Sequence, residues 1–417
     1  MAFTAFSTAL SALSANTTAI NVVANNLSNL NTNGFKSSSV VFSDLVSQSL
    51  GSGDTQVGLG TAQPITVRQY TQGSLSSTGG SLDCAIQGDG FFVVSDANDT
   101  QLYTRAGNFE VDAEGNLVTV TGENVQGWTA VNGTVDTNAE ISDIVVPVGT
   151  MSEPVATTEV SLNLNLNAEG VTGETTGAFS TPVEIVDSLG VTHTLTVNFT
   201  KTGENTWDYE VTIPGEEVAA GTSGTAYSVT TDTFTFDENG LLTDPAAPAT
   251  VDISIAGLTS GAGDLSIEWA LYDDSGASLM TQYSAESSLS AVAQNGSQAS
   301  ELTSVTVGDG GEVLAEYSNG EQKIVAQLAL ASIRNPDSLV AKGDNNYALS
   351  EQSAEPAIGT AGTGGRGEIV GQAVEASNVD IAEELTNLII YQRGYQANSS
   401  VVTTLDEITE ETISMKR

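Results

Sequence analysis

The first 35 residues constrain this chain most, because they contain no charged side chain and the first charge is Lys36. Large apolar residues recur in this stretch at spacings of three, four or seven, which is typical of the a and d positions of a helix that packs against a partner. The other positions carry mainly Ala, Ser, Thr and Asn, which suit close packing between helices. The pattern predicts an N-terminal helix with a self-assembly seam made of Phe3, Phe6, Leu10, Leu13, Ile20 and Leu27.

A second helical pattern runs to the C-terminus. Ser377, Asn378 or Asp380 can cap this helix, and Glu383 and Glu384 suit its positive N-terminal end. We expect the two terminal helices to pack against each other and against their copies in neighbouring subunits. The second half of the assembly seam consists of Ile381, Leu385, Leu388, Tyr395, Val402, Leu405 and Ile408.

Two other interpretations of the N-terminal stretch fit less well. A secretory signal needs a positively charged start and a continuous apolar stretch, and a membrane span needs about 20 predominantly apolar residues. Asn and Thr interrupt the segment 1–27, which also lacks a positive start. We therefore predict neither membrane insertion nor a cleaved signal peptide, while an ordinary core helix remains an alternative.

The charge balance excludes some classes of partner. The 52 acidic and 11 basic residues give a net charge of −41, and no cluster of Lys and Arg is available to neutralise phosphates. Nucleic-acid binding is therefore excluded, and binding to an anionic membrane surface is disfavoured. The single cysteine, Cys84, excludes an internal disulfide and a cysteine-based metal site.

Short alternating segments fill the middle of the chain and predict strands. Apolar residues alternate with Ser and Asn from Val160 to Leu166, and turn residues separate many similar stretches. The fold class we predict is multidomain α+β, with terminal helices forming a coiled-coil-like axial domain and two mainly-β domains, the outer inserted into the inner. The expected domains are an axial domain of 1–30 with 378–417, an extended connector of 31–70 with 363–377, a middle domain of 71–145 with 284–362, and an outer domain of 146–283.

Motifs that could carry chemistry are weak. His193 is the sole histidine, and Cys84 lies in an apolar setting that favours a buried structural role. The glycine pattern at 362–367 lacks the strand–helix context of a nucleotide site and favours a flexible joint. Acidic turns at 112–116, 237–240 and 273–276 lack the distal glutamate of a calcium loop, so β-turns are favoured. We predict no catalytic, cofactor or metal site, and hence no enzyme.

The segment 24–36, ANNLSNLNTNGFK, closely resembles the N-terminal signature of the rod and hook family, the axial proteins of the bacterial flagellum. The stretches 88–94, 103–128 and 391–399 resemble the same family. Leu30 departs from its pattern, since Ala is frequent there, and so does Cys84, where small aliphatic residues are usual. The signature residues are Asn25, Asn26, Asn31, Gly34, Phe35, Ser377, Asn378, Asp380, Gln396 and Asn398.

Within the family, short sequence segments between 186 and 215 resemble the outer domain of hook-type members. Shorter rod-type members generally lack this domain. This resemblance implies a structural subunit that polymerises into a short curved tube, a universal joint that links rod to filament and transmits torque. It also implies a homopolymer at the hook and basal body, outside the cell. The implied partners are the distal rod protein, the hook cap or scaffold protein, the hook–filament junction proteins and the flagellar export apparatus.

Alternatives to that function remain at this point. A distal-rod-like or hook-associated subunit fits the two ends of the chain, although the inserted domain argues against a rod subunit. A secreted β-rich protein that binds a ligand or calcium fits the acidic composition. That second class would not require two helical termini with apolar seams.

Overall fold

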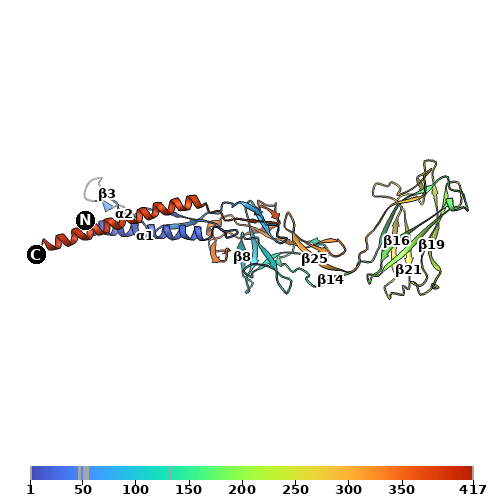
Figure 1. The fold of residues 1–417 in the computed structure, drawn as a ribbon, viewed down its shortest axis with the longest axis horizontal. Helices are drawn as coiled ribbons and strands as arrows, with labels where there is room; N and C mark the ends of the chain where they lie inside the picture. The colour runs from blue at the N-terminus through green and yellow to red at the C-terminus, as the bar shows by residue number, and fades with distance from the viewer. Residues whose placement is uncertain (1, 46–47, 50–55, 132, 416–417) are drawn as a thin grey trace. The chain divides into compact units, whose positions relative to one another are not determined.

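The computed structural model describes residues 2–45, 48–49, 56–131 and 133–415, and it divides the chain into two compact units. Unit 1 comprises Met1–Val148, Thr303–Glu316 and Gln322–Arg417, and unit 2 comprises Gly149–Leu302 and Tyr317–Glu321. Two helices at the ends of the chain and a mostly-β body confirm the predicted fold class (Figure 1).

The terminal helices are α1 (Ala2–Ser28) and α2 (Ile381–Ser414). They pack side by side and antiparallel, so the start of α1 and the end of α2 lie at the same end of the pair (Figure 1). Asp380 caps α2, because its side chain accepts hydrogen bonds from the backbone N–H groups of Ala382 and Glu383 at 2.8 and 3.1 Å.

A two-stranded antiparallel ribbon follows α1 and consists of β1 (Ser38–Val41) and β4 (Ile65–Arg68). Between them, β2 (Gln48–Ser49) pairs with β3 (Gln56–Val57).

The predicted extended connector is wrong for its C-terminal half, 363–377. There β32 (Glu368–Gly371) pairs with β6 (Cys84–Gln87), and β33 (Ala373–Glu375) pairs with β5 (Leu75–Ser77). Both strands therefore belong to the β body of unit 1. The physical reason is burial of their apolar residues Ile369, Ala373 and Val374, which an extended solvent-exposed linker would leave in water.

The main sheet of unit 1 has the strand order β26-β27-β11-β7-β8-β30-β29, with smaller strands attached to β11, β7 and β10. Its core gathers aromatic and small side chains, including Phe91, Tyr103 and Trp128. The strands are β7 (Phe91–Ser95), β8 (Gln101–Thr104), β9 (Phe109–Val111), β10 (Leu117–Thr119), β11 (Asn124–Val131), β12 (Thr134–Val135), β13 (Ser142–Asp143), β26 (Glu312–Tyr317), β27 (Gln322–Leu328), β28 (Leu330–Ser332), β29 (Val340–Gly343), β30 (Asn346–Ala348) and β31 (Ala357–Gly359).

Unit 2 contains two five-stranded sheets that share one apolar core. The alternation from Val160 to Leu166 is confirmed as a half-buried strand, since its apolar residues are buried and the residues between them are not. One sheet is β16 (Ala178–Val186), β17 (Thr192–Lys201), β18 (Thr206–Pro214), β19 (Ala226–Phe236) and β20 (Leu242–Asp244). The other is β21 (Thr250–Ile255), β22 (Leu265–Ala270), β15 (Glu159–Asn167), β23 (Met280–Tyr283) and β24 (Ser288–Gln294).

The boundaries of the inserted domain differ from the predicted 146–283. Strand β24 pairs with β15 over six residue pairs, and β14 (Met151–Ser152) pairs with the start of β25 (Ser300–Val307). Residues 284–302 therefore belong to unit 2. Val146 is buried in unit 1, where its N–H donates to the Gly115 carbonyl. The sequence of β24, SLSAVAQ, is mostly small and exposed, so its periodicity did not mark it as part of the inserted domain.

Candidate assembly surface

The most deeply buried face of α1 consists of small residues. Ala9, Ala15, Ala19 and Val23 are buried there. On the α2 side, Gly394 allows close approach, because a Cβ at this position would lie 2.9 Å from Asn16 Oδ1. Small residues therefore form the most deeply buried part of the α1 surface, and they permit a closer helix contact than large ones would.

The predicted assembly seam is only partly covered in the single chain. Leu10 is 54% exposed, Phe6 is also exposed, and the remaining α1 seam residues with described side chains, Leu13, Ile20 and Leu27, are half-buried. The side chain of Phe3 lies outside the described residues. On α2, Ile381, Leu385, Tyr395 and Ile408 are exposed, whereas Leu388, Val402 and Leu405 are half-buried.

Asn26 joins both helices to the ribbon. Its amide nitrogen donates to the Ser38 carbonyl at 2.8 Å and to Glu384 Oε1 at 2.7 Å, and its oxygen accepts from the Ser38 N–H at 3.0 Å. Burial raises the pKa of the Glu384 carboxyl, and the Asn26 hydrogen bond opposes that shift. Asn26 is fully buried, and both its amide nitrogen and its amide oxygen are hydrogen-bonded. An apolar side chain at this position could not make these bonds.

Asn378 and Gly34 hold the same junction from the other side. Asn378 Oδ1 accepts from the Ser37 N–H at 2.7 Å, and its nitrogen donates to the Gln69 carbonyl at 2.9 Å. Gly34 has a φ of +70°, and a Cβ there would lie 2.6 Å from the Ala106 nitrogen. Only glycine fits this backbone contact without a displacement.

The other signature residues divide by environment. Asn398 is half-buried and donates to the Gly394 carbonyl at 2.9 Å, and Ser377 Oγ accepts from the Val379 N–H at 3.4 Å. Phe35 is half-buried, whereas Asn25, Asn31 and Gln396 are exposed. The structure therefore places Asn26, Gly34 and Asn378 where the helices join the body, and Asp380 at the N-cap of α2.

A buried ionic cluster at this junction is a feature that our sequence analysis missed. Lys36 Nζ lies 2.6 Å from Glu375 Oε1, and Arg105 Nη1 lies 3.3 Å from Glu375 Oε2. Burial lowers the pKa of both Lys36 and Arg105, and the charge of Glu375 opposes this. The available signal was Lys36 itself, a lone charge that ends a 35-residue uncharged segment.

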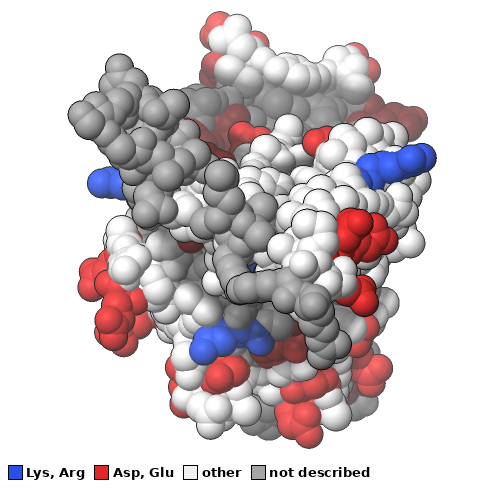
Figure 2. Space-filling view, turned by 90° about the vertical axis from the view of Figure 1, so that its left-hand side faces the viewer, with Lys and Arg blue, Asp and Glu red and all other residues white. Residues whose placement is uncertain are grey.

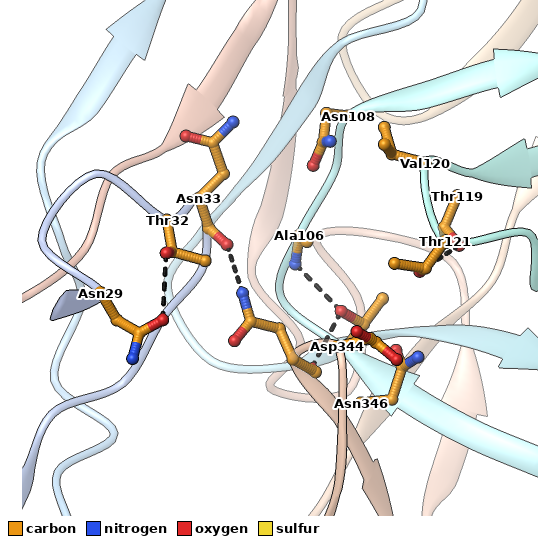
Figure 3. A pocket seen from close by; sticks show the side chains of 12 residues that line it. Asn29, Thr32, Asn33, Ala106, Asn108, Thr119, Val120, Thr121, Asp344 and Asn346 are labelled. Atoms are coloured by element: carbon orange, nitrogen blue, oxygen red, sulfur yellow. Dashed lines mark hydrogen bonds between the residues drawn. The ribbon is translucent and has the colours of Figure 1, made fainter. Parts of the chain in front are cut away.

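A pocket of about 370 Å³, lined mainly by Asn and Thr residues, lies beside the junction, between the turn after α1 and the β body (Figure 3). Asn345 donates to the Asn33 carbonyl at 2.8 Å, and Thr104 Oγ1 donates to the Asn345 carbonyl at 3.2 Å. Figure 3 shows Thr32 and Asn33 on one side of the cavity and Ala106 and Thr119 on the other. These bonds attach the turn that follows α1 to the β body.

The acidic turns are β-turns, as the sequence analysis favoured. Asp112, Asp237 and Asp273 each accept the N–H groups two and four residues later, and each turn closes with a glycine N–H bonded to the Asp carbonyl. Their carboxylates are thus engaged by their own turns. Among the described residues, no group of three or more His, Cys, Asp or Glu side chains is arranged to hold a metal ion.

His193 and Cys84 are both buried. His193 Nε2 lies 3.1 Å from Asp187 Oδ2 and its Nδ1 lies 2.7 Å from Glu217 Oε2, while Ser260 donates to Asp187 Oδ2 at 2.7 Å. The serine therefore bonds the carboxylate and not the imidazole, which is not the order of a nucleophilic triad. Burial raises the pKa of the Cys84 thiol well above its usual value, so this cysteine is unreactive.

The surface charge is acidic over much of the molecule. On the face that Figure 2 presents, acidic side chains form several separate groups and basic ones are few. Lys201 is the single Lys or Arg within 149–302, and it is buried with its amine donating to the Ala168 carbonyl. In the described part of the chain, no helix combines the length and apolar character that a membrane crossing requires.

Comparison with known families matches four segments of the chain. Residues 6–36 match "Flagella basal body rod protein", and residues 85–172 match "Flagellar hook protein FlgE/F/G D1 domain". Residues 163–297 match "Flagellar basal body protein FlaE D2 domain", and residues 370–415 match "Flagellar basal body rod FlgEFG protein C-terminal".

Full-length relatives carry the same description. The flagellar hook protein FlgE of Escherichia coli K12 is 33% identical over 426 residues, covering 99% of this chain and 100% of the relative. That of Treponema pallidum is 32% identical and covers 96% of both chains, and that of Rhizobium meliloti is 32% identical and covers 98% of both. The crystal structure of Helicobacter pylori flagellar hook protein FlgE2 has a TM-score of 0.53 at 16% identity, covering 72% of this chain and 100% of that one, so it shares the fold.

Proposed function

Because the chain belongs to the flagellar hook protein family, we propose that it is the structural subunit of a hook, a helical polymer of its own copies. The polymer forms a short curved tube that connects rod to filament and transmits torque. The assembly seam of α1 and α2 makes the contacts between subunits of the innermost layer. The exposure of Phe6 and Leu10 on an uncharged helix carries this assignment.

Energetics support assembly through the terminal helices. Ordering a residue costs about 1–2 kcal/mol of backbone entropy, and a fully buried large apolar side chain returns about 1.5–3 kcal/mol. In the single chain, α2 buries none of its described side chains. Contacts with neighbouring copies supply the missing burial, so the terminal segments are largely unfolded in the monomer and helical in the polymer.

The ends of the tube contact different proteins. By family membership, these are the distal rod protein, the hook cap, and the hook–filament junction proteins, and the subunit reaches its place outside the cell through the flagellar export apparatus. Binding of these partners uses the same axial helices, since a tube presents at each end the surface that the next copy would cover.

Leu13→Asp tests this function, because it places a charge within the assembly seam. We expect it to abolish polymerisation, measured by sedimentation and electron microscopy, while the thermal unfolding of the β domains stays unchanged. Leu13→Met keeps an apolar side chain of similar size and should still polymerise. A Leu13→Asp chain that forms normal tubes contradicts the assignment, as does slow amide exchange throughout 2–27 in a verified monomer.

A further inference from the structure

The ribbon carries an apolar face that remains substantially exposed at Val41 and Ile65. Val41 and Ile65 lie directly opposite each other in the antiparallel register and are 49% and 63% exposed. Val67, two residues along β4, shares this face and is half-buried. An isolated two-stranded sheet is marginal in water, and an exposed β-branched face adds to its instability.

The ribbon is nevertheless held in a defined place along both helices. Asn26 and Asn378 bond the backbone at its start, as described above. Further out, the Thr61 N–H donates to Ser11 Oγ at 3.3 Å, and Phe42 lies against Tyr391 with ring centroids 5.9 Å apart. The ribbon is therefore fixed next to both α1 and α2.

Charge indicates what can cover this face. Residues 38–41 and 65–67 carry no charge, and neither does the whole of α1. In a chain with a net charge of −41, these are surfaces on which two copies can meet without direct repulsion between like charges. Among the α1 side chains that the structure describes, the large apolar ones that are exposed are Phe6 and Leu10, which offer a complementary uncharged surface.

We propose that the Val41–Ile65 face of the ribbon is a second self-assembly surface, which binds the Phe6–Leu10 end of α1 in a second copy of this chain. The inference rests on the proposed polymerisation and names one contact within it. The contact is heterologous, because the ribbon of one copy meets the helix of the next, so it repeats along a polymer and does not close as a two-fold dimer.

Cysteine cross-linking between copies tests this pairing. Full-length chains carrying Ile65→Cys are mixed with chains carrying Leu10→Cys, polymerised and oxidised. The native Cys84 is buried and stays unreactive in the background. We expect a mixed disulfide dimer on denaturing gels. Val120→Cys, exposed on the β body of unit 1, replaces Ile65→Cys in the control and should give none.

A charge at the same face gives an independent measurement. Ile65→Asp is expected to raise the subunit concentration needed for assembly about tenfold or more, which corresponds to about 1.4 kcal/mol. Thr66→Asp adds the same charge to the exposed opposite face of β4 and should have little effect. Thermal unfolding of both variants as monomers checks that the β domains remain folded.

The outcomes separate this inference from the proposed function. Polymers that form normally with Ile65→Asp, without the mixed cross-link, overturn the ribbon contact even when Leu13→Asp blocks assembly. Cross-linking of Ile65→Cys chains to one another in place of Leu10→Cys chains also overturns it, because the ribbon then pairs with a second ribbon. Normal assembly of Leu13→Asp contradicts the proposed function instead.

Discussion

Lys36 Nζ and Glu375 Oε1 lie 2.6 Å apart in a fully buried ion pair that joins residues 339 positions apart in the chain. Lys36 follows α1 and Glu375 precedes α2, so the pair sits where both terminal segments meet the β body. Glu375 Oε1 also accepts the Gly73 N–H at 2.8 Å, and Lys36 donates to the Thr71 carbonyl at 2.9 Å. The segments next to both terminal helices are therefore attached to the β body at the same buried ion pair.

Removing Glu375 should destabilise unit 1 strongly. Glu375→Ala leaves the charges of Lys36 and Arg105 buried without their partner, and loss of one member of a buried pair costs about 3–5 kcal/mol. Urea unfolding of the monomer measures the change in the free energy of unfolding. Glu368→Ala is the matched control, because Glu368 is exposed on β32, the strand that precedes β33 in the sequence. A loss for Glu375→Ala no larger than that of the control would contradict the anchoring role.

Acid should destabilise the protein through its acidic turns. The Leu241 N–H and the Asn239 amide hold the pKa of the Asp237 carboxyl below its usual 3.8. Because the folded-state pKa is the lower one, the stabilisation is complete above the unfolded value and is lost as pH falls through the folded value. We expect the melting temperature to fall below about pH 4.

Asp237→Asn tests that link, because an amide oxygen can still accept the turn hydrogen bonds but does not titrate. The variant should show a shallower fall in melting temperature between about pH 4 and pH 2. Asp252→Asn, exposed on β21, is the control. Identical acid profiles for Asp237→Asn and the original chain would show that this turn does not contribute.

Excision of the inserted domain should succeed only at the boundaries seen in the structure. Met151 pairs with Glu301 and Ser152 with Ser300, so a short Gly/Ser linker in place of 153–299 joins neighbouring residues. We expect unit 1 to keep its melting temperature and to polymerise into tubes of altered stiffness. Removing 146–283 instead takes away the buried Val146 and leaves β24 without β15, and this variant should misfold. Equal behaviour of the two deletions would refute the boundary.

Tubes should loosen as salt is removed. Within 149–302 the single basic residue, Lys201, is buried, so carboxylates there have no exposed cationic partner in that segment. The screening length grows from about 8 Å at 0.15 M salt to about 30 Å at 0.01 M, which lets carboxylates of adjacent copies repel each other. Polymers are dialysed across this range, with and without a chelator, and light scattering and electron microscopy measure the length and stiffness of the tubes. Tubes of unchanged length and stiffness at low salt would mean that the carboxylates do not oppose assembly.

Much of the local structure could be predicted from periodicity. The 3.6-residue pattern indicated both terminal helices, and the structure has them at Ala2–Ser28 and Ile381–Ser414. The two-residue pattern indicated β15 and the strands of unit 2, and the Asp-x-x-Gly segments indicated turns. These signals are local, because a residue's position on a helix or strand face follows from its neighbours in sequence.

The candidate site was only partly predictable, and Asn26 shows why. As a signature residue it was named from the sequence, but its bond to Glu384 depends on a helix residue 358 positions away. An asparagine in the sequence does not reveal which group its side chain will hydrogen-bond. The same holds for Lys36, whose charge was visible and whose buried partner was not.

Local sequence patterns were enough to predict the two terminal helices, the strand β15 and the uncharged N-terminal stretch. The tertiary structure was needed to see that the small residues of α1 are its most deeply buried ones, and that β24 and β33 pair with β15 and β5. Periodicity specifies the face that a segment presents but not the surface that covers it. That choice depends on pairings between distant segments, where short strands gain their hydrogen bonds and apolar burial only once the rest of the chain is in place.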